Sequence, residues 1–123
     1  MAGRVVHFEI PIDDADRATT FYERALGWKP ERWGPIEYWT VDPGEGEGIG
    51  GALATRDDPS STVVIYIDVD DIEATLKEVE AAGGRRLTEP RPIPTVGWNA
   101  LFQDSEGNAV GLFQADPAVT FPG

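Results

Sequence analysis

The 123-residue chain contains no cysteine and only one histidine, His7. Without cysteine, it cannot form disulfides, use a thiolate nucleophile or bind zinc through sulfur. Its apolar runs are far shorter than the roughly 20 residues of a membrane-spanning helix, and the residues before Val5 lack the apolar core of a signal peptide. We therefore expect a cytoplasmic protein that is neither exported nor inserted into a membrane.

Basic residues are also scarce, because 10 lysines and arginines face 22 acidic residues and give a net charge of −12. Such a surface repels phosphate backbones and anionic lipids, so neither nucleic acid nor a membrane is an expected partner. The acidity fits a well-solvated surface; attraction of a cationic ligand is the alternative. At this length, with 41% hydrophobic residues, the chain fits one domain, 1–123.

An internal repeat divides that domain into two modules. Residues 5–14 resemble residues 62–71, at an offset of 57 that places His7 on Val64. Each copy starts with an alternating strand, turns at paired aspartates that can cap a helix, and continues in a helix that ends near a glycine. The repeat predicts module one at 4–55, a linker at 56–61 and module two at 62–115.

Each module also predicts one helix followed by three strands. The apolar faces of the helices are Ala18, Phe21, Tyr22 and Ala25 in module one, and Ile72, Leu76 and Val79 in module two. The predicted strands are 28–32, 36–41 and 48–55, then 85–87, 98–103 and 109–114. We expect the proline-rich stretch 90–94 to be a loop, and Glu106-Gly107-Asn108 to be a hairpin turn with positive φ at Gly107 and Asn108.

Three stretches of the chain resemble a known family. They are His7-Phe8-Glu9-Ile10 with Phe21-Tyr22 and Leu26-Gly27-Trp28, then Val69-Asp70-Asp71-Ile72 with Gly83-Gly84, and finally residues 102–114. Together they resemble the vicinal oxygen chelate superfamily, which includes glyoxalases, bleomycin resistance proteins and dioxygenases. The resemblance implies an α+β fold in which two tandem βαβββ modules form a curved mixed sheet, a cup for one small molecule, and a homodimer with two such cups.

The resemblance also implies where a metal would bind. Metal-dependent members hold a divalent ion with His and Glu side chains on the first and last strands of each module. The corresponding positions here are His7, Val64, Gly111 and the stretch Gly50–Leu53, and only His7 can donate to a metal. Because a protein metal site normally has three or more protein ligands, we expect neither a metal nor another cofactor.

His7 and Glu9 are the polar residues of the first strand. Alternation places them on one face with Val5, and places Val6, Phe8 and Ile10 on the opposite face, under the helices. The pair could act as acid and base, anchor a polar ligand group, or be hydrogen-bonded structural residues. The sequence leaves these alternatives open.

Aromatic residues are the other distinctive feature. Some could simply pack in the core, but flat rings across a cup could also sandwich a planar ligand. The predicted ligand-binding residues are His7, Glu9, Trp33, Tyr38, Trp39, Tyr66, Trp98 and Phe113.

Two functions follow from these features. The first is a metal-independent binding protein, not an enzyme, that sequesters a bulky aromatic natural product or antibiotic, as metal-free members related to bleomycin resistance proteins do. The alternative is a metal-independent lyase or isomerase that uses His7 and Glu9 as acid and base. A residual metal enzyme is a third hypothesis, which the ligand count disfavours.

Overall fold

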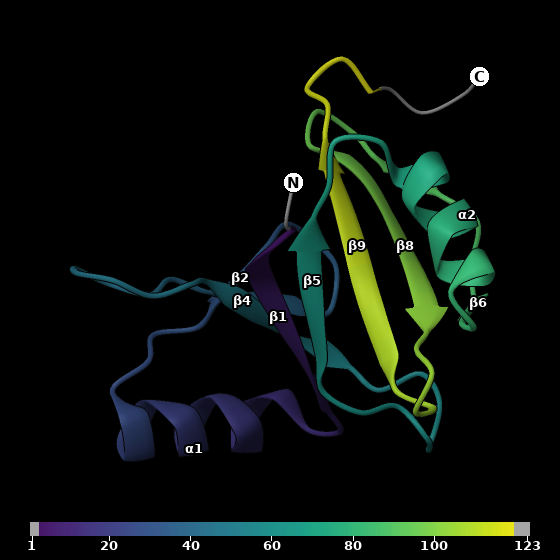
Figure 1. The fold of residues 1–123 in the computed structure, drawn as a ribbon. Helices are drawn as coiled ribbons and strands as arrows, with labels where there is room; N and C mark the ends of the chain where they lie inside the picture. The colour runs from purple at the N-terminus through teal and green to yellow at the C-terminus, as the bar shows by residue number, and fades with distance from the viewer. Residues whose placement is uncertain (1–2, 120–123) are drawn as a thin grey trace. The chain divides into compact units, whose positions relative to one another are not determined.

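A computed structural model describes residues 3–119, which form two compact units. The N-terminal unit spans residues 6–64, and the C-terminal unit spans residues 65–119 together with residues 3–5. The boundary, between Val64 and Ile65, lies a few residues beyond the predicted linker at 56–61. Each unit contains one helix and its own set of paired strands (Figure 1).

The N-terminal unit has the predicted βαβββ order. Its elements are β1 (Arg4–Ile12), α1 (Ala15–Leu26), β2 (Glu31–Arg32), β3 (Tyr38–Val41) and β4 (Gly51–Thr55). Within the unit the strand order is β2-β3-β4-β1; β1 and β4 are parallel, and the other pairs are antiparallel. Strands β2, β3 and β4 all begin two or three residues later than predicted.

The C-terminal unit repeats this arrangement and adds one strand. Its elements are β5 (Val64–Asp68), α2 (Ile72–Ala81), β6 (Arg85–Arg86), β7 (Arg91–Ile93), β8 (Gly97–Gln103) and β9 (Ala109–Ala115). The order is β5-β9-β8-β6, with β7 also paired to β8. The prediction of a loop at 90–94 was therefore wrong. Proline is tolerated in β7 because this short strand lies at an edge, where a missing N–H breaks no ladder.

Equivalent caps start the two helices. The side chain of Asp14 accepts a hydrogen bond from the Arg17 backbone N–H at 3.0 Å, and Asp71 accepts one from Ala74 at 3.0 Å. The two aspartates are related by the predicted offset of 57. At the other end of α1, Gly27 takes the left-handed conformation with φ 73°. In the described part of the chain, neither helix is long and apolar enough to span a membrane.

Each unit has its own apolar core. In the N-terminal unit, Phe8 and Ile10 pack against buried Ile12, Val41 and Leu53, as predicted, whereas Val6, which was predicted on the same inner face, is 37% exposed. Helix α1 covers this core with Ala15, Ala18 and Tyr22. Phe21, which the sequence placed on the same apolar face, is instead 60% exposed.

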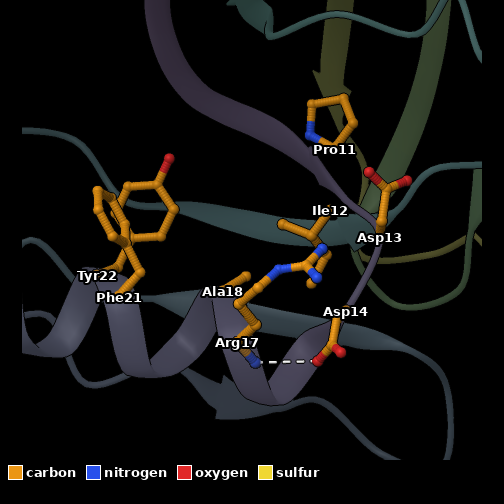
Figure 2. Close-up of a pocket in the computed structure, with 8 residues that line it drawn as sticks. All are labelled: Pro11, Ile12, Asp13, Asp14, Arg17, Ala18, Phe21 and Tyr22. Atoms are coloured by element: carbon orange, nitrogen blue, oxygen red, sulfur yellow. Dashed lines mark hydrogen bonds between the residues drawn. The ribbon is translucent and has the colours of Figure 1, made fainter.

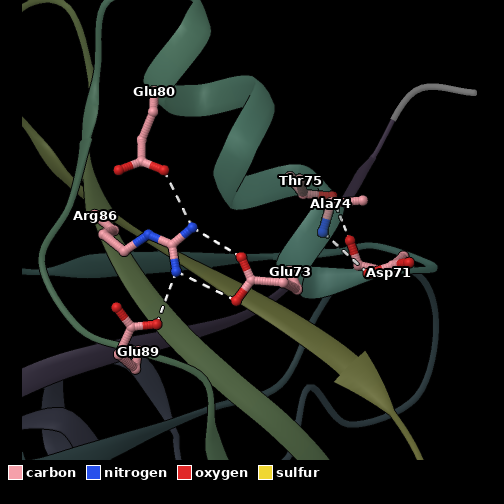
Figure 3. Close-up of polar contacts among 7 residues, drawn as sticks. All are labelled: Asp71, Glu73, Ala74, Thr75, Glu80, Arg86 and Glu89. Carbon is pink, nitrogen blue, oxygen red and sulfur yellow. Dashed lines mark hydrogen bonds and ion pairs between the residues drawn. The ribbon is translucent and has the colours of Figure 1, made fainter.

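The C-terminal core lies beneath α2, where Ile72 and Leu76 pack with Ala100 and Leu112. A cluster of ion pairs lies beside this helix (Figure 3). The Arg86 guanidinium contacts the carboxylates of Glu73 at 2.8 Å, Glu80 at 3.1 Å and Glu89 at 2.7 Å.

The β8–β9 turn corrects one detail of the prediction. Gly107 has φ 84° as expected, but among the described residues Asn108 does not have positive φ. The Asp104 carboxylate shapes the turn instead, by accepting hydrogen bonds from the backbone N–H groups of Glu106 and Asn108 at 2.8 and 2.9 Å. These bonds, led by that from Asn108, lower the pKa of Asp104.

Candidate functional site

A polar cluster occupies the face of the N-terminal sheet that points away from its core. Because side chains alternate along β1, His7 and Glu9 share this face while Phe8 and Ile10 point into the core. The His7 and Glu9 side chains are 32% and 28% exposed. They are therefore partly shielded from water, yet still accessible to a small molecule.

Tyr38 joins this cluster from another strand. It lies on β3, and β4 runs between β3 and β1. On the shared face β4 presents only two alanines, since Ala52 pairs with Glu9 and Ala54 pairs with Tyr38. Small side chains at these positions leave room for the phenol of Tyr38 to cross β4 and reach β1.

The three polar groups form a hydrogen-bonded relay. The Tyr38 hydroxyl donates to Glu9 Oε2 at 2.8 Å and lies 3.1 Å from His7 Nε2, while His7 Nε2 and Glu9 Oε2 are 3.4 Å apart. A phenol has one proton, and here it points to the carboxylate. The 3.1 Å contact is then a hydrogen bond from His7 to Tyr38 in the His7 tautomer, or the imidazolium, that carries a proton on Nε2. In that form the three groups make the relay His7 to Tyr38 to Glu9.

Trp33 lies at the edge of this relay. Its ring contacts that of Tyr38 edge to face, with centroids 6.0 Å apart and planes at 62°. The indole is 52% exposed, which is unusual for so large an apolar side chain. The structure therefore brings together four of the predicted site residues: His7, Glu9, Trp33 and Tyr38.

Two other predicted residues lie elsewhere. Trp39 alternates with Tyr38 and packs against the N-terminal core, and Trp98 packs against the core beneath α2. Both rings are therefore on the helix-covered faces of their sheets. This placement gives no support to their predicted role as ligand-binding residues, and we leave them out of the proposal below.

Tyr66 and Phe113 share the face of the C-terminal sheet that points away from α2. Tyr66 pairs with Gly111 and Phe113 follows two residues later on β9, whereas the intervening Leu112 is in the core. Tyr66 is only 8% exposed. A Cβ built on Gly111 would overlap the Tyr66 ring at Cδ1 and Cε1. Only glycine therefore lets the ring lie flat on β9.

The packing of Tyr66 on Gly111 determines whether the metal of the family could bind here. Gly111 is the position at which the resemblance calls for a ligating glutamate, and Tyr66 already fills the space that a side chain would need. Within residues 3–119 no three His, Cys, Asp or Glu side chains come together as a metal site. The residues present therefore do not fit the family's metal, and no step below is routed through one.

The sequence did not reveal that the Tyr38 hydroxyl contacts His7 and Glu9. Tyr38 was predicted as an aromatic lining residue, and only His7 and Glu9 as acid and base. Contact between them depends on the order β3-β4-β1 and on the two alanines of β4. The alternation of Tyr38 and Thr40 with Trp39 and Val41 was the available signal. It predicts on which face of the sheet Tyr38 lies, but not which strands lie beside β3.

A hollow of about 300 Å³ lies beside the start of α1 (Figure 2). It is lined by Pro11, Ile12, Asp13, Asp14, Arg17, Ala18, Phe21 and Tyr22. None of these described lining residues belongs to the polar relay. Asp13 is paired with Arg56 at 3.1 Å and Asp14 caps the helix, so its acidic groups already have structural partners.

Comparison with known proteins identifies the family. The sequence profile of the Glyoxalase/Bleomycin resistance protein/Dioxygenase superfamily matches residues 4–112. The chain belongs to this superfamily. A glyoxylase-like domain-containing protein from Didymella fabae is 31% identical over 115 residues, which cover 86% of this chain and 89% of that protein.

Two further proteins are similar to this chain. A Mycobacterium bovis protein named as a glyoxylase, CFP32, is 30% identical to this chain over 94% of its length. This chain spans only 45% of the length of that protein. The methylmalonyl-CoA epimerase structure from Mycobacterium tuberculosis has a TM-score of 0.63 at 19% identity, over 92% of this chain and 88% of that one. At this identity the likeness establishes the shared α+β fold alone.

Proposed function

We propose that this protein is a metal-independent enzyme that moves a proton on a small carbonyl compound, as an isomerase or lyase does. The observation that carries the proposal is the Tyr38 hydroxyl, held 2.8 Å from Glu9 and 3.1 Å from His7 on an accessible sheet face. A proton donor and a carboxylate at one point are what general acid–base catalysis needs.

Each residue has a distinct part in this chemistry. Glu9 takes a proton from the carbon next to the carbonyl, so the C–H electron pair forms the C=C bond of an enol. Tyr38 gives its proton to the carbonyl oxygen, and His7 in its imidazolium form then returns a proton from Nε2 to the Tyr38 phenolate and becomes neutral. Reversal of these steps returns a proton to the same or a neighbouring carbon. All atoms and charges balance without an oxidant or a metal.

The names of similar proteins agree with this class of reaction. One relative is called glyoxylase-like, and one structure of the same fold is a methylmalonyl-CoA epimerase. These names do not supply a substrate, because the structural likeness is limited to the fold. The proposal for this chain therefore rests on the relay.

Hydrogen–deuterium exchange tests the proposal. The protein, treated with EDTA, is mixed in D₂O with phenylacetone, cyclohexylacetone or hydroxyacetone, and loss of the signal from the protons next to the carbonyl is followed by NMR. Glu9→Gln should lower the exchange rate about 10²- to 10⁴-fold. Glu23→Gln, an exposed carboxylate on α1, is the matched control. Wild-type protein that accelerates none of the exchanges, or Glu9→Gln protein with full activity, would contradict the proposal.

A second candidate is binding without turnover, the function first predicted from the sequence. One observation favours it, the 52% exposed Trp33 ring beside Tyr38. Sequestration of an aromatic natural product or antibiotic predicts saturable binding followed by recovery of the unchanged ligand. Recovery of an altered ligand would exclude it. Cytoplasmic location and a homodimer remain predictions.

A further inference from the structure

The loop that bears Trp33 is shaped by a single arginine. It joins β2 to β3 and spans residues 33–37, with Gly34 in the left-handed region at φ 66°. The backbone N–H of Trp33 donates to the Tyr38 carbonyl at 2.8 Å and closes the loop at its base. Trp33 thus starts a closed loop whose other end is a residue of the proton relay.

Arg32 ties this loop together from within. Its Nε donates to the Ile36 carbonyl at 3.1 Å, and its Nη2 donates to the Pro35 carbonyl at 3.1 Å and to Glu37 at 3.0 Å. The guanidinium also lies 5.8 Å from the centre of the Trp39 ring. A side chain that is 48% exposed therefore makes four contacts, all within residues 32–39.

The result is an apolar surface held out toward solvent. Trp33 is 52% exposed and Ile36 is 48% exposed, although each would lower its free energy by burial. Arg32 is hydrogen-bonded to the carbonyls of Pro35 and Ile36, and these bonds restrict any rearrangement of the loop that would bury Trp33 and Ile36. The Trp33 ring is left beside Tyr38, with much of its surface open.

We propose that this Arg32-tied loop is the substrate-recognition element, and that it selects a planar, uncharged group such as an aromatic ring. The inference rests on the proposed function and names the substrate class of the same site. Trp33 binds the planar group and thereby brings an adjacent carbonyl to Tyr38. Arg32 is a positioning residue. Glu37 offsets its charge, so the loop does not recognise a carboxylate.

A binding comparison tests the recognition step separately from catalysis. Benzamide and cyclohexanecarboxamide differ in planarity but not in charge, and neither has to react. Ligand-observed NMR should show that wild-type protein prefers benzamide by about 2- to 12-fold, the range that corresponds to one aromatic stacking contact. Trp33→Ala should abolish the preference, and Trp33→Phe should keep part of it.

The role of Arg32 needs its own variants. Arg32→Met should reduce the benzamide preference without lowering the urea midpoint of unfolding, and Arg32→Lys should restore part of it. Arg24→Met, an arginine in the last turn of α1, is the control. A full preference in Arg32→Met would overturn the positioning role, and a full preference in Trp33→Ala would overturn the recognition element. A Trp33-dependent preference without any proton exchange would support the recognition element while the proposed enzymatic function fails.

Discussion

The two modules share one plan but divide its tasks. The offset of 57 places buried Ile72 and Leu76 of α2 on Ala15 and Thr19 of α1. Helix α1, all of whose residues are described, accordingly buries no side chain completely, whereas α2 anchors a core. The polar groups show the opposite pattern, because His7 and Glu9 of the first module correspond to Val64 and Tyr66 of the second. The proposed acid–base groups therefore lie in the first copy of the repeat, whereas the helix that buries complete side chains lies in the second.

The largest stability difference should be between the two helices. Leu76→Ala removes a fully buried side chain and should lower the free energy of unfolding by about 2–5 kcal/mol. Phe21→Ala removes a larger but 60% exposed side chain and should change it by no more than about 0.5 kcal/mol. Urea unfolding of both variants checks this. Equal losses would show that α1 is as tightly packed as α2.

Much of this division could be predicted from the sequence, because it depends on local patterns. Both helix caps, the alternation of β1 and, apart from β7, the order of elements in each module follow from residue spacing. The loss of metal ligands was also predicted from His7, Val64 and Gly111. The relay was not, since the contact between Tyr38 and Glu9 requires strands that are distant in sequence to lie on either side of β4.

The missed strand β7 also has a physical cause. Strand β7 was missed because Pro92 indicates a loop, and only an edge position makes it compatible with a strand. Trp39 and Trp98 were predicted to line the ligand site because aromatic residues suit both a core and a binding surface. The side of the sheet on which each ring lies depends on the exact residue at which its strand begins, and the sequence does not predict that residue.

A smaller effect is expected where Tyr66 covers Gly111. Gly111→Ala should cost about 1–3 kcal/mol of stability, because the new methyl group overlaps the ring. In a Tyr66→Ala background the same substitution should cost close to nothing. Urea unfolding of the two single variants and the double variant measures this coupling. An equal cost in both backgrounds would mean that the ring does not fill the space at the family's ligand position.

Part of the acid dependence of stability should come from the Arg86 cluster of the second module. Arg86 lowers the pKa of Glu73, chiefly through the hydrogen bonds between them. A lowered pKa in the folded state adds stability above the pKa of the unfolded chain, and this stability is lost as pH falls through the folded value.

The urea midpoint of wild-type protein should therefore fall between pH 7 and about pH 3, and Arg86→Met should fall less over this range. The Asp104 turn should still contribute to the remaining decline, because its lowered pKa has the same sign of effect. Identical pH profiles for Arg86→Met and wild-type protein would show that the Arg86 cluster contributes no pH-dependent stability.

The most direct test of the central claim, that the first module carries the chemistry, removes one oxygen atom. Tyr38→Phe keeps the ring against Trp33 but breaks the relay between His7 and Glu9, whereas Tyr22→Phe removes a hydroxyl from the same unit outside the relay. In the deuterium-exchange assay, Tyr38→Phe should lose about a hundredfold or more in rate, with Tyr22→Phe within about twofold of wild type. A Tyr38→Phe variant that exchanges as fast as wild type would contradict the account.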